Sequence, residues 1–194
     1  MRLFVAVELD EAVRREAARV ARTLAAALDR QGTGRGVAWV AAENLHLTLQ
    51  FLGEVDAPTA RIVADRVSEP LAIPAFDVAL GGLGTFPPAG PPRVIWVGVT
   101  EGAGQLAASH AEVSRRLDGL GFPRENQPFR AHLTLGRVKA PLGRHVSEIL
   151  AGTSVAREAR CRVDHLTLFE SRLSPRGATY SVVATARLGY HHPS

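Results

Sequence analysis

The sequence carries the same four residues, His-Leu-Thr-Leu, at two places that begin at His46 and His132. In a β-strand alternate side chains share a face, so each copy places its histidine beside a threonine, Thr48 or Thr134. Two histidines with ordinary pKa values of about 6.5 can hold one neutral and one protonated ring near neutral pH. The two tetrads therefore predict an acid and a base for proton transfer.

A phosphate group is the ligand that best suits these side chains. The hydroxyls of Thr48 and Thr134 can donate hydrogen bonds to two of its non-bridging oxygens. Arg130 lies two residues before His132, so on a strand it shares that face. Its guanidinium can then form a pair of charge-assisted hydrogen bonds with the phosphate. In-line displacement at phosphorus then needs one histidine to activate water and the other to protonate the leaving oxygen. We expect no metal, because no Asp or Glu shares the tetrad faces.

A third copy of the tetrad begins at His165. In the repeated order of elements given below, it falls on a strand that does not correspond to the strands of the other two copies. We therefore interpret His165 and Thr167 as structural residues, and we take His46 and His132 as the functional pair.

The elements around the tetrads follow one order twice: strand, helix, tetrad strand, helix, strand. The spacing of apolar residues predicts each element, with Asp10 as a helix cap and Gly32 as a helix stop. In the first half the elements are Arg2–Leu9, Asp10–Gly32, Leu45–Leu52, Pro58–Val67 and Phe76–Leu80. In the second half they are Arg93–Val99, a helix from Leu106 that ends around Gly119 to Gly121, Phe129–Val138, Leu142–Leu150 and Arg162–Phe169, with an extra strand at Thr179–Leu188.

Residues 87–92, Pro-Pro-Ala-Gly-Pro-Pro, form the clearest break in the chain, because proline does not continue a helix or a central strand. We expect this segment to connect halves of approximately 1–86 and 93–190. A duplicated order usually folds as two similar lobes about a pseudo-twofold axis, which would bring the two tetrads face to face in a cleft. The sequence thus predicts a single two-lobed domain over residues 1–194.

The composition is that of a globular protein, and its excess of arginine either suits an anionic partner or reflects the composition of the genome. The 194 residues are 46% hydrophobic, which is enough for a sizeable core, and the formal net charge is +4. Lys139 is the only lysine, so nearly all of the positive charge is arginine, which suits phosphate. The sequence has no long apolar run, no signal-like start and a single cysteine, Cys161. We therefore expect a monomer in the cytoplasm, with no membrane segment and no internal disulfide.

The segments around the tetrads carry a resemblance to one known family, and the resemblance runs over nearly the whole chain. They are Asn44–Gly53, Phe129–Arg130 and Leu168–Leu173, with Gly177 and Tyr180. Through them the sequence resembles the RNA 2′,3′-cyclic phosphodiesterases, also called the 2′-5′ RNA ligase family, of the two-histidine phosphoesterase superfamily. One position departs from the family pattern: Ala131 stands where proline commonly precedes the second histidine, and no functional group is lost.

The resemblance implies an α+β, bilobal fold with pseudo-twofold-related lobes, antiparallel sheets lining a central cleft and helices on the outside. It implies hydrolysis of an RNA 2′,3′-cyclic phosphate end to a 2′-phosphomonoester, with no metal and no cofactor. By the resemblance His46 and His132 are the catalytic pair, Thr48 and Thr134 bind the phosphate, and an arginine is expected at Arg130. We expect His46 to protonate the departing 3′ oxygen and His132 to activate water.

Several alternatives stay open on the sequence alone. Because the chemistry is reversible in principle, the same site could also join RNA ends through a 2′-5′ linkage. The protein could instead be a phosphodiesterase that acts on small cyclic nucleotides or on ADP-ribose cyclic phosphate. It could also be a non-catalytic RNA-binding protein, which an assay on a cyclic-phosphate-ended oligonucleotide would reveal.

Overall fold

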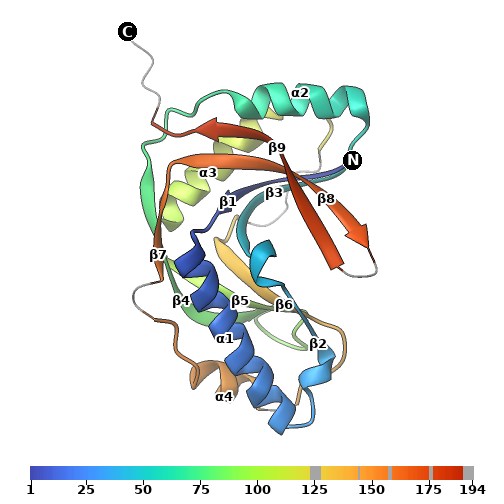
Figure 1. Cartoon of the computed structure of the whole chain (residues 1–194), viewed down its shortest axis with the longest axis vertical. Helices are drawn as coiled ribbons and strands as arrows, with labels where there is room; N and C mark the ends of the chain where they lie inside the picture. Colours follow the sequence, from blue (N-terminus) through green and yellow to red (C-terminus); the bar gives the residue numbers. More distant parts are fainter. Residues whose placement is uncertain (123–127, 144, 157–158, 175–176, 190–194) are drawn as a thin grey trace.

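The computed structural model describes residues 1–122, 128–143, 145–156, 159–174 and 177–189. Over these residues the chain forms one antiparallel sheet of nine strands with helices against it, which confirms the α+β class (Figure 1). The strands are β1 (Arg2–Glu8), β2 (Val37–Trp39), β3 (His46–Glu54), β4 (Phe76–Phe86), β5 (Val94–Glu101), β6 (His132–Val138), β7 (Arg160–Val163), β8 (His165–Ser174) and β9 (Gly177–Arg187). The helices are α1 (Glu11–Arg30), α2 (Ala57–Ser68), α3 (Ala103–Arg116) and α4 (Val146–Ala151), with short 3-10 turns η1 (Gly34–Gly36) and η2 (Ala42–Asn44).

The two helices of the first half of the chain begin at carboxylate caps. The side chain of Asp10 accepts a hydrogen bond from the Val13 amide at 2.8 Å, and Asp56 accepts one from the Thr59 amide at 2.8 Å. Each cap satisfies an amide that has no partner within the first helical turn. The apolar positions of α1 that the spacing predicted to face the core are buried: Val13, Ala17, Val20, Leu24 and Leu28.

The strand order places the two tetrads at the centre of the sheet. The order is β7-β4-β5-β6-β3-β1-β8-β9, with β2 paired to β6. Strands β3 and β6 begin with the two tetrads and meet where Leu47 pairs with Leu133. The order is symmetric about this contact, because β5 and β1 flank the pair, followed by β4 and β8 and then by β7 and β9. The sheet therefore has the pseudo-twofold arrangement that the duplicated sequence predicted.

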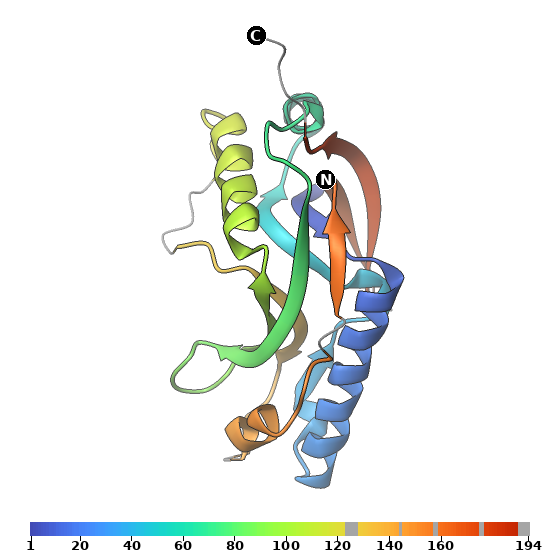
Figure 2. The ribbon, with the colours of Figure 1, turned by 90° about the vertical axis from the view of Figure 1, so that its left-hand side faces the viewer.

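The two halves of the sheet are not the two halves of the sequence. Strand β4 comes from residues 1–86 but pairs with β5 and β7, whereas β8 comes from residues 93–190 and pairs with β1. The proline-rich segment joins β4 to β5 as antiparallel neighbours, so it does not separate two lobes. The helices also pack against elements from the other half of the sequence. Helix α1 packs beside α4 and β6, and α3 packs beside α2 and β3 (Figures 1 and 2).

One predicted strand is wrong, because Arg162–Phe169 is divided between β7 and β8. Strand β7 pairs with β4 in one half of the sheet, and β8 pairs with β1 and β9 in the other. Asp164, which is exposed, separates the two strands. At Asp164 the chain therefore passes from one half of the sheet to the other.

The leucines of the tetrads anchor their strands in the main core. Leu47, Leu49, Leu133 and Leu135 are buried in one cluster with the apolar faces of the helices. Burial of each leucine stabilises the fold by about 1.5 to 3 kcal/mol, so the orientation of both strands is strongly determined. The opposite face of the sheet, with the histidines and threonines, stays partly accessible. None of the described helices is long and apolar enough to span a membrane.

Candidate active site

The register of β3 and β6 brings the four polar tetrad residues together. Because Leu47 pairs with Leu133 in an antiparallel contact, the next positions place His46 opposite Thr134 and Thr48 opposite His132. Side chains that oppose one another in an antiparallel pair share a face, with Cβ atoms about 5 Å apart. All four side chains are partly exposed on the face opposite the buried leucines. The site is therefore a square with a histidine and a threonine on each strand.

Two adjoining hollows open on this square. The His46 pocket has a volume of about 400 Å³, and His46, Thr48 and Thr134 line it. The His132 pocket has a volume of about 560 Å³, and Thr48, Arg130 and His132 line it. Thr48 belongs to both, so a group bound at Thr48 would lie between the two imidazoles. The structure thus brings together all five residues that the sequence predicted for the site.

Both imidazoles are held in the same way by the chain just before them. The Nδ1–H of His46 donates to the carbonyl of Asn44 at 2.7 Å, and the Nδ1–H of His132 donates to the carbonyl of Arg130 at 2.7 Å. A carbonyl oxygen only accepts, so Nδ1 must carry the proton in each ring. The Nε2 atom is then left as the base in a neutral ring and as the acid in a protonated one.

Aromatic side chains enclose His46. Its ring stacks on Phe4 with centroids 4.8 Å apart, Tyr180 meets it edge-on at 5.3 Å, and Phe169 lies at 6.3 Å. Burial lowers the pKa of His46 to about 4, although the hydrogen bond to the Asn44 carbonyl and the charge of Glu8 oppose this shift. The ring of His46 is therefore neutral at neutral pH in the free protein.

Phe86 is an aromatic neighbour that His132 shares with Arg130. The ring of Phe86 meets the imidazole edge-on with centroids 4.9 Å apart, and the Cζ atom of Arg130 lies 5.6 Å from the centre of the same ring. Phe86 thus forms a common wall for an imidazole and a guanidinium. Because Arg130 is exposed and lines the His132 pocket, its guanidinium can reach an anion bound there.

Comparison with known proteins assigns the chain to a family. The family model of the 2′-5′ RNA ligase superfamily matches residues 9–174. The chain belongs to this superfamily. A relative from Archaeoglobus fulgidus, named RNA 2′,3′-cyclic phosphodiesterase, is 38% identical over 180 residues, which cover 93% of this chain and 96% of that protein. A relative of the same name from Thermotoga maritima is 33% identical over 184 residues, which cover 94% of this chain and 93% of that protein.

Structural comparison agrees with this assignment. The crystal structure of TT0787 of Thermus thermophilus matches with a TM-score of 0.73 and 31% sequence identity, and the match covers 99% of this chain and 100% of that chain. The resemblance drawn from the sequence is therefore confirmed at the level of the superfamily and of its fold.

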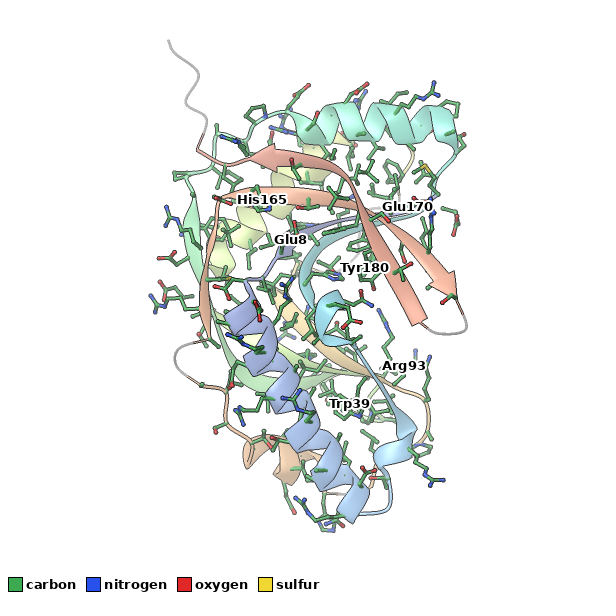
Figure 3. All side chains as sticks on the ribbon, viewed as in Figure 1. Glu8, Trp39, Arg93, His165, Glu170 and Tyr180 are labelled. Atoms are coloured by element: carbon green, nitrogen blue, oxygen red, sulfur yellow. The ribbon has the colours of Figure 1, made fainter. Side chains whose placement is uncertain are left out.

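The third tetrad lies away from the two pockets. Figure 3 shows its histidine, His165, near Glu8. His165 contacts Asp164 through Nδ1 at 2.6 Å and Glu8 through Nε2 at 3.4 Å, and Thr167 donates to Glu8 at 2.8 Å. Burial alone would lower the pKa of His165, but the hydrogen bonds to Asp164 and Glu8 outweigh it and raise that pKa. These contacts engage both ring nitrogens, which agrees with the structural role expected for this copy.

Several residues that line the His46 pocket were not predicted from the sequence as residues of the site. They are Arg2, Phe4, Phe51, Arg137 and Tyr180. Strict alternation along a strand places Phe51 and Arg137 on the leucine face, because each lies five residues after its histidine. A register shift in each strand reverses the alternation: Ala6 pairs with Thr48 but Val5 with Gln50, and Trp96 pairs with Thr134 but Ile95 with Gly136. The two residues that follow each tetrad threonine are both buried, which is the burial pattern of such a bulge.

Proposed function

We propose that this protein hydrolyses RNA 2′,3′-cyclic phosphate ends to 2′-phosphomonoesters by acid and base catalysis from two histidines. The observation that carries the proposal is the pairing of two identical tetrads at the centre of the sheet. In each of them Nδ1 is bound to a backbone carbonyl, which leaves Nε2 for proton transfer beside a threonine hydroxyl. The names of the relatives support the choice of a cyclic phosphate as the substrate.

The class of enzyme follows from the family. The chain is a phosphodiesterase of the 2′-5′ RNA ligase superfamily, since its relatives carry the name RNA 2′,3′-cyclic phosphodiesterase over almost their whole length. This assignment disfavours a non-catalytic RNA-binding protein. Joining of RNA ends through a 2′-5′ linkage is the reverse of the hydrolysis proposed here, and it stays a prediction.

In the proposed mechanism the cyclic phosphate binds at the square of tetrad residues. The hydroxyls of Thr48 and Thr134 donate hydrogen bonds to its two non-bridging oxygens, and Arg130 adds positive charge from the His132 pocket. Nε2 of His132 takes a proton from water as the water oxygen bonds to phosphorus. The bond from phosphorus to the 3′ oxygen breaks, and His46 gives its Nε2 proton to that oxygen. The phosphate remains on the 2′ oxygen.

The acid role of His46 requires that substrate binding changes its protonation. With a pKa of about 4, only about one ring in a thousand is protonated at pH 7, which corresponds to about 4 kcal/mol. A phosphate anion held beside Nε2 favours the protonated ring and opposes the effect of burial. We propose that His46 takes up a proton as the cyclic phosphate binds. The reverse assignment, with His46 as the base, predicts no such uptake.

We also propose that the reaction needs no metal ion. The described residues that line the two pockets include no Asp or Glu, and the tetrads supply two imidazoles and two hydroxyls. Charge on the phosphate is then balanced by hydrogen bonds and by arginine. A monomer in the cytoplasm remains the expectation for the state and place in which the enzyme works.

The test is an assay on three substrates in the presence of EDTA. They are an oligoribonucleotide that ends in a 2′,3′-cyclic phosphate, adenosine 2′,3′-cyclic phosphate, and ADP-ribose cyclic phosphate. The proposal expects the highest kcat/KM on the oligonucleotide, with a 2′-phosphomonoester as the product. Preference for either small substrate would favour the alternative function, and a 3′-phosphomonoester product would contradict the proposed cleavage.

A further inference from the structure

The two bulges place an unlike pair of residues at equivalent positions of the cleft. Phe51 follows the first tetrad and Arg137 follows the second, and both are exposed and line the His46 pocket. The residue just before each of them, Gln50 or Gly136, is buried. The bulges thus extend the site beyond the four tetrad residues, with an aromatic ring on one strand and a cation on the other.

Arg137 has a second cation as its neighbour. Arg2 is also exposed and lines the His46 pocket. Burial raises the pKa of Tyr180, and the charges of Arg137 and Arg2 both oppose that rise, so both guanidinium groups act on the same phenol. Within the described part of the chain, no carboxylate forms an ion pair with either arginine, whereas Arg160, Arg162 and Arg172 each have one. Two cations that have no carboxylate partner among the described residues therefore face one hollow.

Large apolar side chains lie beside these cations. Phe51 is 55% exposed and Leu173 is 68% exposed, which are high values for such side chains in a protein with an apolar core. Both line the His46 pocket with the two arginines. A pocket that combines arginine with an accessible aromatic ring is suited to single-stranded nucleic acid, since phosphates contact the cations and bases stack on the ring.

The position of these groups relative to the tetrads identifies the phosphate. Arg137 lies three residues beyond Thr134 on β6, which is about 10 Å along a strand. Its backbone is therefore displaced along the strand from the threonine, and its guanidinium can reach a phosphate next to the one that the threonine binds. We infer that Arg2 and Arg137 form a second phosphate subsite, which binds the phosphodiester on the 5′ side of the cyclic-phosphate nucleotide. This inference rests on the proposed function.

Two substrates could supply the second phosphate. An RNA end offers a phosphodiester, and ADP-ribose cyclic phosphate offers a pyrophosphate. The exposed ring of Phe51 beside the arginines favours RNA, because a polynucleotide carries a base next to each phosphate. We commit to the phosphodiester of RNA, and ADP-ribose cyclic phosphate becomes one arm of the test.

The experiment compares substrates that differ by one nucleotide. Adenosine 2′,3′-cyclic phosphate has one phosphate, and the diadenosine dinucleotide ApA with a 2′,3′-cyclic phosphate end has two. The wild-type enzyme is expected to show a kcat/KM at least tenfold higher on the dinucleotide. Arg137→Gln and Arg2→Gln should each lower kcat/KM at least fivefold more for the dinucleotide than for the mononucleoside. Arg22→Gln, which changes an exposed arginine of α1, is the matched control and should keep both values within twofold.

The outcomes separate this inference from the proposed function. Equal losses on both substrates, or no loss on either, would overturn the subsite while hydrolysis of a cyclic phosphate stands. If the two arginine substitutions lower kcat/KM more for ADP-ribose cyclic phosphate than for the dinucleotide, the subsite binds a pyrophosphate and the RNA assignment is overturned. Absence of wild-type hydrolysis on every cyclic phosphate would refute the proposed function, and the subsite with it.

Discussion

The burial of His46 predicts that the protein loses stability as the pH falls from 6.5 toward 4. The pKa of His46 is lowered from 6.5 to about 4 in the folded protein, so between these values the unfolded chain binds a proton that the folded protein does not. Unfolding is therefore favoured as the pH falls through this window. The whole shift corresponds to about 3 kcal/mol, and about 2.5 kcal/mol of it lies between pH 7 and pH 4.5.

The substitution His46→Gln removes the titrating group and keeps a polar side chain of similar size. Urea unfolding of both proteins at pH 7 and at pH 4.5 should show that the wild type loses about 2.5 kcal/mol more than the variant over this interval. The other titrating groups are the same in both proteins, so their contributions to the unfolding free energy cancel in this difference. His165 has the opposite sign, because its raised pKa stabilises the fold at low pH and this contribution is lost as the pH rises.

The same prediction can be measured directly by NMR. The Cε1–H resonance of His46, assigned by its loss in His46→Gln, should titrate with a midpoint near pH 4 in the free protein. In the presence of inorganic phosphate the midpoint should rise, since the anion favours the protonated ring. A midpoint near 6.5 in the free protein, or parallel stability curves for the two proteins, would refute the argument from burial.

Further predictions concern other residues of the site and of the fold. If Arg130 binds the phosphate through a fork, Arg130→Lys should lower kcat/KM nearly as much as Arg130→Ala, and a twofold change or less in both would place it outside the site. His165→Ala should keep kcat/KM within about threefold, and a loss as large as that for His46 would show that the wrong pair was chosen. Hydrogen bonds from Arg115 and then Arg116, against the effect of burial, lower the pKa of Glu112 to about 2. Glu112→Gln should therefore cost about 2 kcal/mol of unfolding free energy at pH 7, a difference that vanishes as the pH falls from 4.5 toward 2. Hydrolysis should survive exhaustive dialysis against EDTA, and activity restored only by added Zn²⁺ or Mn²⁺ would contradict the metal-independent mechanism.

The tetrads and the elements that carry them could be predicted from local sequence patterns. The buried leucines alternate with the polar residues, and this alternation predicted which face of β3 and β6 carries the candidate site. The duplicated order predicted the pseudo-twofold sheet. It did not predict that β4 pairs with strands of the second half of the sequence and that β8 pairs with β1 of the first half. The pairing of strands depends on contacts between distant segments, which alternation does not encode.

The surroundings of His46 could not be predicted for the same reason. Phe4 comes from β1, Phe169 from β8 and Tyr180 from β9, so the rings that enclose the imidazole are brought together only by the order of the strands. The pKa of His46 therefore depends on the tertiary structure. Phe51 and Arg137 were missed because the bulges interrupt the alternation that otherwise identified the cleft face.

The central claim is that the two tetrads act as one acid and base site, and the most direct test measures hydrolysis by His46→Ala, His132→Ala and the double variant. The substrate is a cyclic-phosphate-ended oligonucleotide, and ³¹P NMR identifies the product. Each single variant should lose at least about 10²-fold in kcat, since each histidine transfers a proton. The loss in kcat of the double variant should be little greater than that of the less active single variant, because the effects of residues that act as a unit are not additive. Full activity in either single variant, or losses that multiply in the double variant, would contradict the claim.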